Sequence, residues 1–133
     1  MNLEKINHTK AAITAVGGYV PDTILSNQDL EKMVDTNDAW ITSRTGIQER
    51  RILKDKATSF LAIEAAQDLI SKNSIEPESI DMVIVATITP DMYVAATAAY
   101  VASSIGAFNA FAYDLSAACS GFLYGMSTSA AYI

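Results

Sequence analysis

The chain has 133 residues, enough for one modest domain, and half of them are hydrophobic, which predicts a packed core. Fifteen acidic residues against nine basic ones give a net charge of −6, which argues against general nucleic-acid binding because phosphate contacts need clustered positive charge. The single cysteine excludes an internal disulfide and a multi-cysteine metal site, and it suits a reducing cytoplasm.

The sequence shows no targeting or membrane-spanning pattern. The first ten residues are polar and lack the apolar centre of a secretory signal. The longest apolar run, residues 82–86, is far shorter than the roughly 20 residues that a membrane span requires. We therefore expect a soluble, cytoplasmic chain with no membrane partner.

The first part of the chain predicts a strand followed by a helix. Residues 11–20 are largely apolar and end near a glycine pair, which is typical of a strand that enters a turn. Ser26 is a candidate N-cap, because its hydroxyl can accept a backbone N–H at the start of a helix. We expect that helix over residues 27–35, with Asp29 in the first turn, where the helix dipole favours an acidic residue.

Two further helices and an extended segment follow. A short helix is expected from Asn37 until Gly46 stops it. Residues 47–53 alternate apolar and charged side chains, as an edge strand or an extended loop does. Thr58 opens the clearest helix, which carries a broad apolar face over the next three turns.

The second half predicts alternating strands and helices. Residues 75–81 form a turn, and residues 82–87 have the continuous β-branched run of a strand buried on both faces. An alanine-rich helix is expected over residues 94–106, a strand over 110–117 and a final helix over 119–133. This alternation predicts a layered α/β domain.

The stretch "DLSAACSGF", residues 114–122, places Cys119 where the last strand turns into the final helix. A helix start presents unpaired N–H groups and the positive end of a dipole, and both favour the reactive thiolate form of a cysteine. The same N–H groups can stabilise an oxyanion during acyl transfer, as in a strand–nucleophile–helix elbow. The alternative is a small buried cysteine packed among alanines.

A cysteine nucleophile usually works with a base or a hydrogen-bond donor. The only histidine, His8, lies in the polar segment before the first strand, where we interpret it as a solvated side chain. A redox or sensor role is disfavoured because the chain has no second, resolving cysteine. The residues alone thus give a candidate nucleophile without an evident partner.

Three stretches together carry a resemblance to a known family: residues 17–30, 34–51 and 114–122. They resemble β-ketoacyl-acyl-carrier-protein synthase III, the condensing enzyme that initiates type II fatty-acid synthesis, and the match runs in order from Ala12 to Ile133. The block from the tryptophan to "RTGI" favours this family over chalcone-synthase-like and hydroxymethylglutaryl-coenzyme A synthases, which share the fold and the nucleophile.

The resemblance implies a thiolase-like α/β fold with α-β-α layers, assembled as a homodimer. Residues 1–133 would form the amino-terminal portion of that domain. Since the final helical pattern reaches Ile133 without a capping residue, we expect the chain to be cut after the nucleophile helix begins, with the carboxy-terminal half missing.

By this resemblance, Cys119 matches the nucleophile that takes a short acyl group from coenzyme A as a thioester. The acyl-enzyme then reacts with malonyl-acyl carrier protein, whose decarboxylation generates the attacking carbanion. The implied partners are therefore an acyl-coenzyme A substrate and a malonyl-carrier protein, with no metal and no further cofactor. The family's histidine and asparagine, which promote decarboxylation, match no position in these 133 residues.

The resemblance also implies a coenzyme A site. Trp40 matches the tryptophan that stacks on the adenine, Arg44 an arginine that helps to sandwich it, and Thr36 a threonine at the nucleotide end of the tunnel. A spacing of four places Trp40 and Arg44 on one helical face, where an aromatic plane and a planar cation can act together. Alternatively, Trp40 covers a core and Arg44 is a surface charge.

Two basic residues and one pocket residue complete the expected site. Arg50 and Arg51 can attract phosphates or an acidic carrier protein, or can form an ordinary solvated face. Val94 stands where many relatives have a phenylalanine that reaches across the dimer into the partner's acyl pocket. A smaller residue there leaves room for a longer or branched primer, unless Met92 or Tyr93 fills the space.

An alternative function stays open beside acyl transfer. The chain is then a non-catalytic piece that dimerises or associates with a complementary half. In support of it, the decarboxylation residues are absent and the final helix is uncapped.

Overall fold

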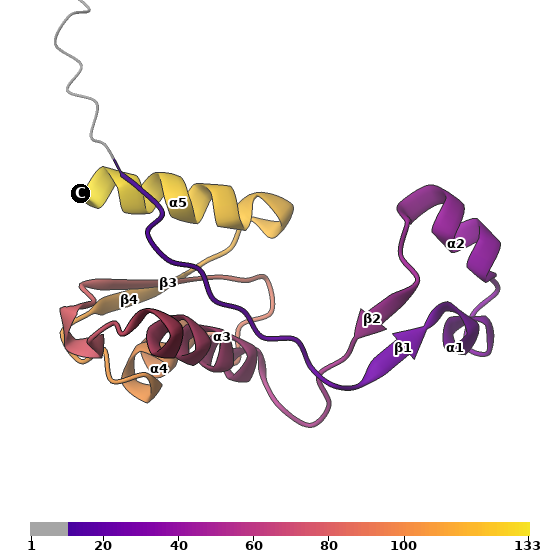
Figure 1. The fold of residues 1–133 in the computed structure, drawn as a ribbon, viewed down its shortest axis with the longest axis horizontal. Coiled ribbons are helices and arrows are strands. Elements are labelled where there is room, and N and C mark those ends of the chain that lie inside the picture. The colour runs from indigo at the N-terminus through magenta and orange to yellow at the C-terminus, as the bar shows by residue number, and fades with distance from the viewer. Residues whose placement is uncertain (1–10) are drawn as a thin grey trace, which may run out of the picture. The chain divides into compact units, whose positions relative to one another are not determined.

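The structure is a computed structural model that describes residues 11–133, so His8 lies outside the described residues. These residues form two compact units (Figure 1). The small unit is Val20–Lys56, and the large unit comprises residues 11–19 and 57–133. Within the described part of the chain, no helix combines the length and apolar character needed to cross a membrane.

The small unit consists of a two-stranded antiparallel sheet and two short helices. Its elements in chain order are β1 (Ile24–Ser26), α1 (Asn27–Glu31), α2 (Asp38–Thr45) and β2 (Glu49–Arg51). In the sheet, Leu25 of β1 lies opposite Arg50 of β2. The predicted edge strand within residues 47–53 is therefore confirmed as β2.

Ser26 caps α1, as predicted. Its hydroxyl accepts the amide N–H of Asp29 at 3.2 Å, and the Asp29 carboxylate in turn accepts the Ser26 amide N–H at 3.2 Å, which completes a capping box. The helix ends at Glu31 and so is shorter than the predicted 27–35. The side chains of Met33 and Val34 are exposed, so no core packing holds another turn.

The predicted bounds of α2 are confirmed. The side-chain oxygen of Asn37 accepts the Trp40 amide N–H at 2.8 Å at the helix start. Gly46 ends the helix in the left-handed region, with φ 71°, and its N–H donates to the Thr42 carbonyl at 2.9 Å. A side chain with a Cβ rarely adopts that conformation, which explains the glycine.

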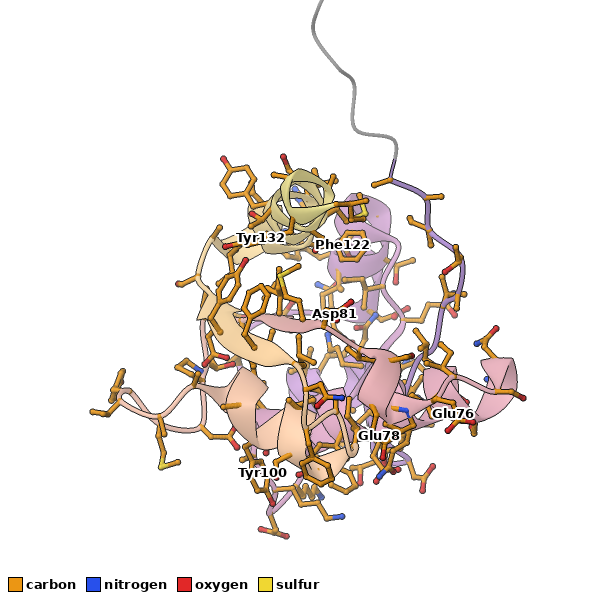
Figure 2. The ribbon with its side chains drawn as sticks, turned by 90° about the vertical axis from the view of Figure 1, so that its left-hand side faces the viewer. Glu76, Glu78, Asp81, Tyr100, Phe122 and Tyr132 are labelled. Carbon is orange, nitrogen blue, oxygen red and sulfur yellow. The ribbon has the colours of Figure 1, made fainter. Side chains whose placement is uncertain are left out.

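The large unit is an α-β-α sandwich around two parallel strands. Its elements are α3 (Thr58–Asn73), η2 (Pro77–Ser79), β3 (Met82–Ala86), α4 (Thr97–Ser104), β4 (Phe111–Leu115), η3 (Ala118–Ser120) and α5 (Gly121–Tyr132). Helix α5 covers one face of the strands, and α3 and α4 cover the other (Figure 1). Figure 2 shows the same layering, with Phe122 and Tyr132 of α5 at the top of the view and Tyr100 of α4 at the bottom.

The core of this unit lies between the strands and α4. Val85, Ala98 and Val101 are almost fully buried there. Partly buried residues packed against them are Ala62, Ile63, Val83, Ile105 and Ala112. Because side chains alternate along a strand, Ile84 and Ala86 face the other way, toward α5.

Glycine lets α5 approach β3 closely. A Cβ added to Gly121 would lie 3.2 Å from the Ala86 Cβ, and one added to Gly125 would lie 4.0 Å from the Ile84 Cγ2. Residues four apart share one helix face, so these two glycines form the face of α5 that meets the strand.

The prediction of a strand over residues 11–20 is wrong. This segment has no regular secondary structure, since no described strand pairs with it, and Ile13 and Val16 are largely exposed. It runs against α3 instead. A Cβ on Gly17 would come within 2.5 Å of the Leu69 Cβ, and the Gly18 amide N–H donates to Asp68 Oδ2 at 3.0 Å.

Two predictions for the second half need correction. The prediction that this strand is buried on both faces is wrong, because Val85 is the one buried residue of β3 and Ala86, on the face toward α5, is exposed. The alanine-rich helix begins at Thr97 and not at Val94. Its start is fixed by Asp114 on β4, whose carboxylate accepts the amide N–H groups of Thr97 and Ala98.

Candidate active site

Cys119 lies in the one-turn helix η3 between the end of β4 and the start of α5, which is the predicted junction. The thiol is free and exposed, so the alternative of a buried packing cysteine is wrong. Ala118, directly before it, has φ 43°, in the left-handed region that alanine seldom occupies. A tight turn with a strained residue that presents an exposed side chain is the geometry of a nucleophile elbow.

The start of α5 lies immediately after this cysteine. Among the described residues, no side chain caps the amide N–H groups of the first turn of α5. Uncapped N–H groups and the positive end of the helix dipole favour negative charge nearby. The arrangement can therefore stabilise a thiolate or an oxyanion formed at Cys119.

Cys119 lines a hollow of about 540 Å³ within the large unit. The wall is mostly apolar, with contributions from α3, β3 and α5, and two threonines. Its lining residues are Thr58, Leu61, Ala62, Ile84, Val85, Ala86, Thr87, Ala118, Cys119 and Phe122. A thioester approaching the sulfur would find apolar surface suited to a short acyl group.

Asp114, near the end of β4, holds the start of α4. Its two carboxylate oxygens accept the amide N–H groups of Thr97 and Ala98, each at 2.8 Å. The residue at the N-cap position, Ala96, has no side chain that can do so. Asp114 is thus an N-cap supplied from another element, and it explains why α4 begins at Thr97.

The loop between β3 and α4 is held at both ends. The Asp91 carboxylate accepts the Ser59 amide N–H at 3.0 Å, which caps α3, and the Asp91 amide N–H donates to the buried Thr97 hydroxyl at 3.0 Å. At the other end, the Thr58 hydroxyl donates to the Thr89 carbonyl at 2.6 Å. The sequence gives no local signal for this role of Asp91, because its partners Ser59 and Thr97 lie on separate helices.

The tip of that loop carries Val94, the predicted acyl-pocket residue. Val94 and Tyr93 are fully exposed, and Met92 is more than half exposed. All three apolar side chains therefore project from a loop with a fixed base. The assignment of Val94 to an acyl pocket stays a prediction.

In the small unit, α2 presents Trp40 and Arg44 together. The Arg44 guanidinium carbon lies 4.5 Å from the centroid of the Trp40 ring, and half of the tryptophan surface is exposed. The residue that α2 buries is Ile41, so Trp40 does not cover a core. The pair is a cation–π contact on an accessible helix face.

The other predicted site residues of the small unit are less prominent. Thr36 is half-buried, directly before the cap of α2. Arg50 donates to the side-chain oxygen of Asn27, and Arg51 lies 3.3 Å from Glu49. Both arginines thus have partners in this unit. Within residues 11–133, no three histidine, cysteine or acidic side chains gather closely enough to hold a metal ion.

Comparison with known proteins decides the relationship. Over 126 residues, the chain is 56% identical to the β-ketoacyl-[acyl-carrier-protein] synthase III of Chlorobaculum tepidum, a match that covers 93% of this chain and 38% of that protein. The predicted resemblance to β-ketoacyl-[acyl-carrier-protein] synthase III, in its amino-terminal portion, is confirmed. No family model matches the chain.

Solved structures agree. The synthase III of Thermus thermophilus superposes with a TM-score of 0.85 at 45% identity, covering 91% of this chain and 38% of that one. The predicted thiolase-like α/β fold is therefore confirmed. The priming β-ketosynthase of the R1128 polyketide pathway also superposes, with a TM-score of 0.82 at 34% identity, covering 87% of this chain and 35% of that one.

The chain spans only 38% of the length of the synthase III relative from Chlorobaculum tepidum. The synthase III similarity thus fixes the fold and the family resemblance of these residues. Activity, substrates and partners belong to the whole relatives, and for this chain they are proposals. The assignment of residues 1–133 to a portion of one larger domain also stays a prediction.

Proposed function

We propose that this chain carries the acyl-accepting part of a synthase III acyltransferase, with Cys119 as the nucleophile. The observation that supports this most directly is the exposed Cys119 at a strained turn, next to the uncapped start of α5. The similarity to synthase III proteins over 93% of the chain supports the same reaction class.

In the first half-reaction, the Cys119 thiolate attacks the carbonyl carbon of an acyl-coenzyme A thioester. A tetrahedral oxyanion forms, and N–H groups at the start of α5 can donate to it. The carbon–sulfur bond to coenzyme A then breaks, and the leaving thiolate takes up a proton. The products are an acyl-cysteine and free coenzyme A.

In the second half-reaction, malonyl-acyl carrier protein loses carbon dioxide and its α-carbon attacks the acyl-cysteine. A carbon–carbon bond forms, the Cys119 thiolate leaves, and the product is a β-ketoacyl-carrier protein. This step needs groups that promote decarboxylation. His8 is the only histidine of the chain, and the resemblance assigns this role to no residue here. The chain alone is thus proposed to complete only the first half-reaction.

We assign recognition of the coenzyme A nucleotide to Trp40 and Arg44, with Thr36 beside them. An exposed indole face with a guanidinium at 4.5 Å suits an adenine ring, which can stack on either plane. A homodimer, with Val94 contributing to the partner's acyl pocket, belongs to the same proposal. A cytoplasmic location fits this chemistry.

Transfer of label from radiolabelled acetyl-coenzyme A tests the proposal. The wild-type chain is expected to retain label after denaturing gel filtration, and Cys119→Ser to lose it. Ser120→Ala, which changes the neighbouring residue and keeps the thiol, is the matched control and should label like wild type. Label that persists in Cys119→Ser, or a wild-type chain that takes up none, contradicts the assignment.

A second candidate function is association without catalysis, and one observation favours it. Helix α5 has no charged residue, and its Phe122, Leu123 and Tyr124 are more than half exposed. Large apolar patches on a soluble unit mark contact surfaces. A chain that binds a complementary polypeptide through α5 but never accepts label on Cys119 would support this candidate over the first.

A further inference from the structure

Asn27 is a fully buried polar side chain at the centre of the small unit. Its exposed fraction is 0%, which is unusual for an asparagine. A buried amide is costly unless all its hydrogen-bonding groups have partners. The partners of Asn27 therefore show what this residue does for the fold.

The amide group of Asn27 joins three parts of the unit to α1. Its Nδ2 donates to Asp38 Oδ1 at 2.6 Å, to the Ile47 carbonyl at 2.9 Å and, more weakly, to Thr42 Oγ1 at 3.3 Å. Its Oδ1 accepts from the Arg50 guanidinium on β2. Two of these partners, Asp38 and Thr42, are on α2, and Ile47 lies just beyond the Gly46 cap of that helix.

Apolar packing contributes little to the placement of α2. Ile41 is its one buried residue, and the helix is only eight residues long. A helix of that length needs tertiary contacts to be stable and to keep one orientation. The Asn27 contacts act at its first residue, at its middle and just beyond its end, so they fix both position and rotation.

We propose that Asn27 is a positioning residue for nucleotide recognition, which orients α2 so that Trp40 and Arg44 face the adenine of coenzyme A together. Asn27 itself is buried and touches no ligand. Its effect reaches the nucleotide through Asp38 and Thr42, which share a helix with the cation–π pair. The inference rests on the proposed nucleotide role of Trp40 and Arg44.

Trp40 is the only tryptophan in the chain, so its fluorescence reports directly on this surface. The probe is adenosine 3′,5′-bisphosphate, titrated against the full chain. In Asn27→Asp the two N–H donors are lost and a carboxylate meets Asp38. We expect the Kd to rise about tenfold, as for a buried polar partner left unpaired. Gln28→Ala, an exposed neighbour on α1, is the matched control and should bind like wild type.

A reversed pair separates positioning from general damage. Asn27→Asp combined with Asp38→Asn restores one donor–acceptor contact between α1 and α2, and it should recover most of the lost affinity. Far-UV circular dichroism and urea denaturation, measured in parallel, report whether each variant chain is still folded. If Asn27→Asp unfolds, Thr42→Val decides, because it removes one hydroxyl of the network and should weaken binding about threefold.

The outcomes are distinct. If the wild-type chain does not bind adenosine 3′,5′-bisphosphate, the proposed role of Trp40 and Arg44 is wrong. Wild type that binds, with unchanged Kd in a folded Asn27→Asp or in Thr42→Val, overturns the positioning role alone. Loss in Asn27→Asp with recovery in the reversed pair supports it.

Discussion

Individual side chains in this protein fix the ends of helices that are distant in sequence. Asp114 on β4 holds the first turn of α4, and Asp91 in the preceding loop holds the first turn of α3. The buried Thr97 hydroxyl joins the two systems. Since Asp114 is five residues before Cys119, the strand that leads to the nucleophile is tied to the loop that carries Val94.

The Asp114 contacts predict a specific loss of stability. In Asp114→Asn, one carboxylate oxygen is replaced by an NH₂ group that faces an amide N–H of α4. We expect a loss of about 1–2 kcal/mol in the free energy of unfolding, measured by urea denaturation. Asp81→Asn removes the same charge from an exposed residue, and it should leave stability nearly unchanged. Equal stability of the two variants would contradict the capping role.

The capping box of α1 predicts a dependence on pH. The Ser26 hydroxyl, followed by the Lys32 ammonium, lowers the pKa of Asp29 from its ordinary 3.8 to about 2. A lowered pKa in the folded chain means that the stabilising contribution is present above the unfolded value and is lost as the pH falls through about 2. Ser26→Ala should raise the pKa of Asp29.

Carboxyl chemical shifts measured by NMR through an acid titration test this directly. The melting temperature of Ser26→Ala should be below that of wild type near neutral pH, and the difference should shrink toward about pH 2. Ser26→Thr keeps the hydroxyl and serves as the control. A melting-temperature difference that is constant over this range argues against the linkage.

At the level of elements, α5 is the helix whose distance from the sheet matters most. A Cβ added to Gly121 would lie only 3.2 Å from the Ala86 Cβ, whereas one added to Gly125 would lie 4.0 Å from the Ile84 Cγ2, an ordinary van der Waals distance. Gly125→Ala should therefore stabilise the chain by about 0.5–1 kcal/mol through helix propensity. Gly121→Ala should gain less or lose stability, because α5 has to shift. Thermal melts of the two variants measure the difference, and a more stable Gly121→Ala would be the contrary result.

The sequence predicted correctly those helix ends whose capping residues lie within one turn of the helix. The bounds of α2 follow from Asn37 and Gly46, and the start of α1 from Ser26, since each cap acts within one turn. The start of α4 does not follow, because its cap is Asp114, 17 residues after Thr97. Residues 11–20 do not form the expected strand, because a strand needs a neighbouring strand to pair with. An apolar composition does not show whether such a neighbour exists.

The same distinction between short-range and long-range contacts applies to the candidate site. The motif around Cys119 predicted the elbow, and a spacing of four predicted the contact between Trp40 and Arg44. The network of Asn27 was missed, because its partners lie on α2, on β2 and in the loop between them, and no short motif predicts such contacts. The only signal was an asparagine at the first position of a predicted helix.

At the scale of the whole molecule, the most prominent feature is the exposed apolar surface of α5. A hollow of about 710 Å³ lies along this helix, lined mostly by apolar side chains that include Phe122, Leu123 and Met126. We expect the chain to self-associate or to bind a complementary polypeptide through this surface.

Sedimentation velocity tests that expectation. Leu123→Lys, on α5, should lower the self-association of the chain markedly. Val34→Lys introduces the same charge at a similarly exposed apolar residue of the small unit, and it should leave association as in wild type. A chain that is monomeric at all concentrations, or equal effects of the two substitutions, would exclude α5 as the contact surface.

The proposed function depends on acyl transfer to Cys119, and peptide mapping after incubation with acetyl-coenzyme A detects that transfer at the residue itself. We predict a mass increase of one acetyl group on the peptide that contains Cys119, removed by hydroxylamine as a thioester is. An unmodified Cys119 peptide in a chain shown to be folded, or acetylation only at other residues, would show that Cys119 is not the acyl acceptor.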